Sequence, residues 1–256
     1  MNLKLRKGYW LIVYGLLGYL LFIVIQLPAS IAWRQVPASI KQTISINSLE
    51  GSIWSATATG VMVNGHALGK MAWHLSPLAL ITGHLGGDVQ IRHPLGTLQG
   101  DFEIDNKQIV ELHNLQGKFN AALLEPLARP MMLNGQFNID IDDARLKRAS
   151  LLEINGTAQW HDAALSGIQD LELGQILVKA VPNAGGSRLQ VSNQNGVIKI
   201  NGEITLAPNG HYNLNLSLLN RDKRRKELDT VLGMLGKPDT SGRVNFRQAG
   251  IIPGFR

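Results

Sequence analysis

The sequence predicts an all-β protein with an N-terminal transmembrane helix, in which an elongated, twisted antiparallel sheet is partly rolled and carries two or three short helices. Three observations support this fold class: an uncharged apolar stretch near the N-terminus, long runs in which apolar and polar residues alternate, and glycines that recur between these runs. With 256 residues, 45% of them hydrophobic, the chain is able to bury a substantial core.

The uncharged stretch covers residues 8–27, and Gln26 is its one strongly polar residue. A helix of this length spans about 30 Å, which matches the hydrocarbon core of a bilayer. Three basic residues come before it: Lys4, Arg6 and Lys7. They predict a cytoplasmic basic tail at 1–7 and a β-rich domain at 34–256 on the other side of the membrane. A cleaved signal peptide ending near Ala32 is the alternative, but its apolar region would be shorter, about 7 to 15 residues.

Alternation with a period of two dominates the rest of the chain. Residues 212–218 place aromatic and leucine side chains on one face of the predicted strand and Asn and Ser on the other, and residues 137–142 repeat the pattern with Asn and Asp. This alternation is typical of antiparallel strands with one buried face. The first run supplies a candidate apolar binding face: Tyr212, Leu214, Leu216 and Leu218.

Glycines and Asn-Gly pairs recur through the alternating region. Short segments that end in glycine come before several runs at irregular spacing, as in LEGSIW from Leu49 and INGEITL from Ile200. They predict a meander with glycine at strand starts, bulges or turns. Asn-Gly pairs favour hairpin turns because both residues tolerate positive φ. Six pairs are therefore predicted to be turns, beginning at Asn64, Asn134, Asn155, Asn195, Asn201 and Asn209.

Three segments carry helix signals. Residues 76–83 begin with Ser-Pro and end at a glycine, and residues 120–130 have room for one or two turns. Residues 222–238 form the best candidate after the apolar stretch, with Asp222 as a cap and several leucines on one side.

No residue pattern indicates an active site. The chain has no cysteine, which excludes disulfides and thiolate chemistry. Its histidines lack the helical spacing of metal ligands, and Asp140 and Asp142 share a polar strand face where solvation explains them. The net charge of +6 includes the three basic residues of the tail, so the mild remainder does not favour nucleic acid. We therefore predict no enzyme, no catalytic, metal-binding or cofactor-binding residue, and no cofactor.

Two sequence blocks and the C-terminal segment are more specific than this general pattern. LEGSIWSATATG contains Gly51, Ile53, Trp54 and Gly60. LGKMAWHLSPLALITGHLGGDVQI contains Trp73, Pro77 and Gly83. The segment LGMLGKPDTSGRVNF contains Gly236, Asp239 and Gly242. Together with the apolar stretch, these residues resemble the type II secretion system protein N family, also called general secretion pathway protein N.

The resemblance implies an accessory inner-membrane component of the type II secretion system of Gram-negative bacteria, with a cytoplasmic N-terminus and a periplasmic main domain. Its β domain would support export of folded periplasmic proteins across the outer membrane through contacts with other inner-membrane or outer-membrane subunits. The family is also similar to AsmA-like membrane-tethered β proteins, so the alternative is a lipid-binding or lipid-transfer groove protein. The sequence leaves open whether the apolar sheet face is an open groove or a closed core.

Overall fold

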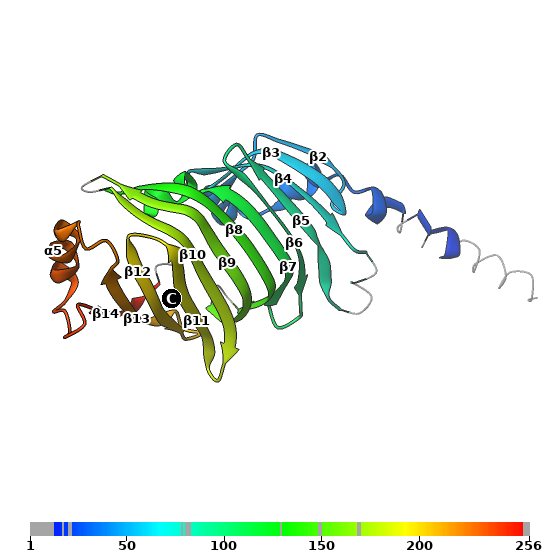
Figure 1. The fold of residues 1–256 in the computed structure, drawn as a ribbon. Coiled ribbons are helices and arrows are strands. Elements are labelled where there is room, and N and C mark those ends of the chain that lie inside the picture. The colour runs from blue at the N-terminus through cyan, green and yellow to red at the C-terminus, as the bar shows by residue number, and fades with distance from the viewer. Residues whose placement is uncertain are drawn as a thin grey trace, which may run out of the picture.

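The computed structural model describes residues 13–252 apart from 17, 20, 21, 78, 80–82, 129, 148, 149, 168 and 169. Fourteen strands form one sheet, in which almost every strand pairs antiparallel with the next strand in sequence. The sheet twists and curves along its length (Figure 1). The predicted all-β, antiparallel class is therefore confirmed for the described residues.

Short elements form the N-terminal edge of the sheet. Helices α2 (Ala29–Gln35) and α3 (Ala38–Thr43) come before β1 (Ile44–Ser45) and β2 (Ser48–Gly51). A proline lies directly before each helix, where its fixed φ and missing N–H are tolerated. Both short strands pair with the same neighbour, β3 (Ser55–Val63).

Eleven longer strands follow as a meander. They are β4 (His66–Leu75), β5 (Leu85–His93), β6 (Gly96–Ile104), β7 (Ile109–Asn120), β8 (Met132–Lys147), β9 (Ser150–Ser166), β10 (Leu171–Asn183), β11 (Gly186–Asn195), β12 (Ile198–Leu206), β13 (His211–Asn220) and β14 (Val244–Ile251). Every connection joins neighbours in the sheet, so one edge of the sheet lies at β1 and β2 and the other at β14.

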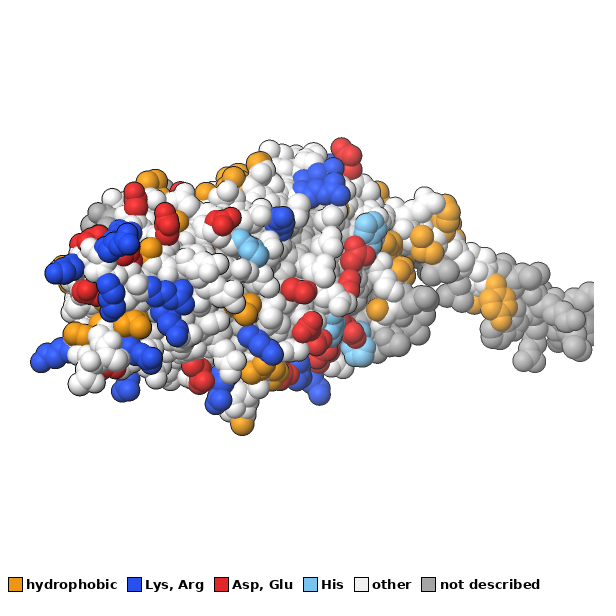
Figure 2. Space-filling view, viewed as in Figure 1, with side chains coloured by type: hydrophobic (Ala, Val, Ile, Leu, Met, Phe, Trp, Pro, Cys, Tyr) orange, Lys and Arg blue, Asp and Glu red, His pale blue; other side chains and the backbone are white. Residues whose placement is uncertain are grey.

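The two faces of the sheet differ because side chains alternate along each strand. The candidate apolar residues of β13 lie opposite apolar residues or glycine of β12, as in the pairs Leu214 with Ile204 and Leu216 with Gly202. The intervening Asn and Ser residues lie on the other face, so the alternation predicted for residues 212–218 is confirmed. The face turned to the viewer in Figure 2 carries mainly polar and charged side chains.

Helix α5 (Lys226–Leu235) packs on the apolar face at the C-terminal end of the sheet (Figure 1). Leu228 is fully buried, and Leu232 belongs to a buried cluster with side chains of β12, β13 and β14. The cluster residues from the strands are Ile198, Leu218 and Val244. The apolar side predicted for this helix is therefore packed at Leu228 and Leu232, whereas Leu235 at its end is 45% exposed.

The predicted helices differ from the observed ones mainly at their ends. A single turn η2 (Ala121–Leu124) and α4 (Glu125–Ala128) occupy the second predicted segment. Asp222 does not cap α5, because its carboxylate accepts a hydrogen bond from the Arg224 amide in the turn before the helix. The first predicted segment, 76–83, lies partly outside the described residues.

Three of the six predicted Asn-Gly turns are wrong. The pairs at strand connections begin at Asn64, Asn195 and Asn209. The pairs that begin at Asn134, Asn155 and Asn201 lie within β8, β9 and β12. In β12 the reason is close approach of two strands, since a Cβ at Gly202 would lie 2.2 Å from the carbonyl oxygen of Asn215. Of the glycines predicted at strand starts, bulges or turns, Gly100 and Gly135 lie at register shifts and Gly242 lies in a turn, whereas Gly117 and Gly202 lie inside regularly paired strands.

The predicted transmembrane helix at residues 8–27 lies only partly among the described residues. Residues 8–12, 17, 20 and 21 are outside them, and residues 22–26 are helical with exposed side chains. Within the part of the chain that the structure describes, no helix combines the length and apolar character that crossing a membrane requires. The transmembrane segment therefore stays a prediction from the sequence.

Candidate functional site: an apolar row and the pocket at its end

One row of directly opposed residues on the apolar face runs through twelve consecutive strands, from β3 to β14. Every member of this row is apolar or glycine. We name it the apolar row, and its members are Ala58, Met71, Ile91, Leu98, Gly117, Ile139, Ala158, Val178, Val191, Gly202, Leu216 and Phe246. Since adjacent strands lie about 4.8 Å apart, the row is roughly 50 Å long.

The described residues do not close the apolar row into a core. Ala58 is buried, with 1% of its surface exposed, but all members from Met71 to Phe246 are only half-buried. Aliphatic side chains in a closed core are usually fully buried. This face is therefore a strip of apolar surface that remains available to another molecule over most of its length, while Leu216 and Phe246 pack against the cluster under α5.

At its β3 end the apolar row leads into an apolar pocket of about 430 Å³. Met71 and Trp73 of β4 line one wall, and Ala32 and Trp33 of α2 line another, together with Val36 directly after the helix. Every lining residue is apolar. The volume falls within the range of small-molecule sites, about 300–1,000 Å³.

Two tryptophans singled out in the sequence hold the N-terminal segment against the sheet. The Trp54 indole N–H donates to the Val24 carbonyl at 2.8 Å, and the Trp73 indole N–H donates to the Ile53 carbonyl at 3.1 Å. The Ile53 amide donates to the Leu27 carbonyl at 2.9 Å. The pocket therefore lies at the joint between the end of the predicted transmembrane segment and the sheet.

Other residues of the two sequence blocks have structural positions near this joint. Gly51 has φ +100°, and a Cβ there would lie 2.3 Å from the Ser55 carbonyl oxygen, so the tight turn into β3 requires glycine. Gly60 lies where the β3–β4 register shifts. Pro77 and Gly83 flank a connection that is only partly described.

The C-terminal motif residues shape the connection from α5 into β14. Gly236 ends α5, and Gly242 closes the following turn. Asp239 accepts hydrogen bonds from the Ser241 hydroxyl at 2.7 Å and from the amides of Ser241 and Arg243 at 2.8 and 2.9 Å. These bonds, the Ser241 hydroxyl first, hold the pKa of Asp239 below its ordinary value.

Histidines on the polar face pair with carboxylates instead of gathering at one point. The pairs are His74 with Asp88 at 3.0 Å, His84 with Glu103 at 3.1 Å and His113 with Asp143 at 2.7 Å. Among the described residues, no three His, Asp or Glu side chains come together in a way that would hold a metal ion. The apolar row and the pocket at its end are thus the features of the described surface best suited to binding.

Comparison with known proteins agrees with the sequence blocks that form the joint. The family described as type II secretion system (T2SS), protein N, matches residues 42–247. The chain belongs to the type II secretion system protein N family. This confirms the resemblance that the sequence blocks predicted.

Relatives named type II secretion system protein N align over almost the whole chain. The Vibrio cholerae serotype O1 protein is 24% identical over 97% of this chain and 99% of its own length. The Klebsiella pneumoniae protein is 23% identical over 91% of each chain, and the Aeromonas hydrophila protein is 22% identical over 93% of this chain and 96% of its own. No solved structure matches the chain significantly.

Sequence reasoning located the tryptophans of the joint but missed the helices and the pocket beside them. The available signals were Pro28 and Pro37, each followed by small or helix-compatible residues. The pocket itself depends on how α2 folds back against β4, which a linear pattern does not encode.

Proposed function

We propose that the chain is an accessory inner-membrane component of the type II secretion system, whose periplasmic β domain supports export of folded proteins through contacts with other subunits. Family membership supports a role as a component of this system and contacts with its subunits. The apolar stretch 8–27 and the basic residues before it support a tether with a cytoplasmic N-terminus. The proposed role is binding without catalysis.

The main support for a contact with another subunit is the difference between the two edges of the sheet. At one edge, β1 and β2 have two and four residues, and α2 and α3 lie beside them. At the other edge, β14 has eight residues and pairs with β13, and on its outer side the described residues bridge only Val244, through Pro238. A long edge strand offers unpaired N–H and C=O groups to a strand of another protein. We infer that a partner subunit adds a strand to β14.

One substitution tests this contact without disturbing the sheet. The Ile252 amide donates to the Gly210 carbonyl at 3.0 Å, so by alternation the Ala249 amide points away from β13. Ala249→Pro removes that outward donor and leaves the β13 ladder intact. We expect co-purification with other secretion subunits to fall about tenfold, equivalent to about 1.4 kcal/mol. Ala249→Val keeps the amide and is the control, and equal co-purification by both variants would contradict strand addition.

The half-buried apolar row favours a second function, the binding or transfer of lipid. An apolar row roughly 50 Å long suits acyl chains as well as apolar protein segments. The two uses are separated by a photoreactive amino acid at Leu216 in living cells, with Asn215 on the opposite face as the control site. Adducts with secretion subunits would support an interface, adducts with phospholipid would support the lipid function, and internal cross-links alone would contradict both uses of the row.

A further inference from the structure

We propose that the pocket at the joint binds one acyl chain of an anionic phospholipid from the membrane, with the lipid phosphate held by Arg34 and Lys41. The proposal rests on the membrane tether proposed above. The lipid site beside the tether is proposed in addition to the contacts with secretion subunits.

The lining of the pocket suits hydrocarbon. All lining side chains are apolar, and the indole N–H of Trp73 is already bonded to the Ile53 carbonyl, so the ring presents only its apolar surface. A peptide segment in this pocket would bring backbone N–H and C=O groups that the lining is unable to bond. An acyl chain has no such groups, so it is the better occupant.

The position of the pocket gives an acyl chain a route from the bilayer. Ile53 lines the pocket and its amide is bonded to Leu27, the last residue of the predicted span. Trp54 is bonded to Val24 within that span. The pocket therefore lies beside the predicted membrane surface, and an acyl chain is able to enter it without crossing a layer of water.

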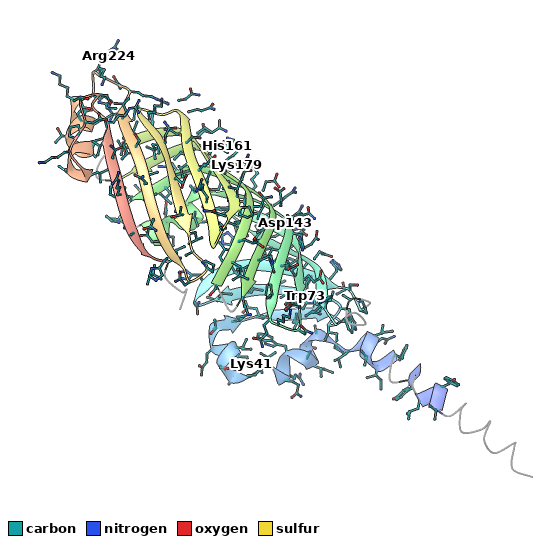
Figure 3. All side chains as sticks on the ribbon, turned by 90° about the horizontal axis from the view of Figure 1, so that it is seen from below. Lys41, Trp73, Asp143, His161, Lys179 and Arg224 are labelled. Atoms are coloured by element: carbon teal, nitrogen blue, oxygen red, sulfur yellow. The ribbon has the colours of Figure 1, made fainter. Side chains whose placement is uncertain are left out.

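The helical segment that lines one wall of the pocket is cationic. Arg34 follows the lining residue Trp33, and Lys41 donates from Nζ to the Arg34 carbonyl at 2.9 Å, which holds the ammonium group against the end of α2. Figure 3 shows Lys41 on α3 at the end of the sheet that carries Trp73. Residues 1–49 contain five Lys or Arg and no Asp or Glu. The charge of this segment is complementary to a lipid phosphate.

The nearest acidic residue in sequence does not oppose this charge inside the pocket. Glu50 lies on β2 next to Leu49, which lines the pocket. Neighbouring residues of a strand point to opposite faces, so Glu50 points away from the pocket.

The test uses the full chain in vesicles of phosphatidylethanolamine and phosphatidylglycerol, with a photoreactive group in the acyl chain of the phosphatidylglycerol. We expect adducts on α2 and β4. Ala32→Phe fills the pocket and should lower these adducts about tenfold, equivalent to about 1.4 kcal/mol. Ile31→Phe makes a similar change on a side chain that is 47% exposed and does not line the pocket, so it should keep them. Val36→Phe is a second filling variant, in case Ala32→Phe fails to fold by circular dichroism.

A separate variant tests how much the two cations contribute to lipid binding. Arg34→Gln combined with Lys41→Gln should lower phosphatidylglycerol adducts about fivefold for each cation removed and leave a phosphatidylethanolamine probe unaffected. Adducts that concentrate on residues 22–26, or that persist in both filling variants, would overturn the lipid site. Vesicle flotation separates the two proposals: a chain that does not float contradicts the tether, whereas a floating chain without pocket adducts contradicts only the lipid site.

Discussion

At the scale of single residues, two indole hydrogen bonds decide how the N-terminal segment meets the sheet. Trp54 reaches back to Val24, and Trp73 reaches Ile53, so both side chains join parts of the chain that lie 20 or more residues apart. A tryptophan buries a large apolar ring while its N–H needs a partner, which suits it to such a joint. The sequence blocks are thus specific because each tryptophan both buries its ring and bonds its N–H to a distant carbonyl.

Removing one of these hydrogen bonds should loosen the joint measurably. Trp54→Phe keeps most of the ring but loses the donor to Val24, and we expect the free energy of unfolding to fall by about 1 kcal/mol. Urea unfolding followed by circular dichroism measures the change. Trp33→Phe removes an indole that makes no hydrogen bond within the described part of the chain, so an equal loss in both variants would contradict the role of the bond to Val24.

The stability that the turn before β14 gives to the fold should depend on pH. Because the pKa of Asp239 is lowered in the folded protein, its carboxylate stabilises the fold above the unfolded-state pKa, and this contribution is lost as pH falls through the folded-state pKa. Asp239→Asn should therefore lower the midpoint of thermal unfolding slightly near neutral pH, with a difference that shrinks below about pH 4. A constant difference between the two proteins from neutral to acidic pH would contradict this linkage.

At the scale of elements, the strands were more predictable than the connections and helix ends. Alternation around Leu216 identified a strand and its apolar face, because one buried face imposes a period of two on the residues themselves. The pair Asn201-Gly202 predicts a turn but lies inside β12, because a glycine that permits positive φ also permits the close approach of two strands. α2 and α3 were missed because they are short and depend on contacts with β2 and β1.

Helix α5 should stabilise the C-terminal end of the sheet. Leu228 is fully buried, so Leu228→Ala should lower the free energy of unfolding by about 2–4 kcal/mol through lost burial and the cavity that it leaves. Met234 lies on the same helix with 80% of its surface exposed. Met234→Ala should therefore change the free energy of unfolding by less than about 0.5 kcal/mol. Chemical denaturation measures both variants, and similar losses would indicate that α5 does not pack as described.

At the scale of the whole molecule, local alternation becomes one continuous apolar row. The row is not predictable from alternation alone. Register shifts at bulges decide which residues of adjacent strands lie opposite each other. The sequence therefore predicted the candidate face of β13 but not its continuation to Ala58. The same limit applies to the pocket, which exists only after α2 folds against the sheet.

The proposed orientation of the molecule is testable with reporter fusions. Alkaline phosphatase fused after Arg256 should be active, because the domain at 34–256 is proposed to be periplasmic and this enzyme requires the oxidising compartment to form its disulfides. The same reporter fused after Lys7 should be inactive. Activity only in the Lys7 fusion would reverse the proposed topology.

The meander order of the strands has a consequence for how the protein forms. Each strand from β4 onward pairs with the strand made just before it, so nearly all contacts needed for a new strand are already present when that strand emerges. We expect folding to proceed from the N-terminal end of the sheet toward β14. At every intermediate stage the newest strand is a temporary open edge, and β14 is simply the last of these edges, which assembly with a partner would complete.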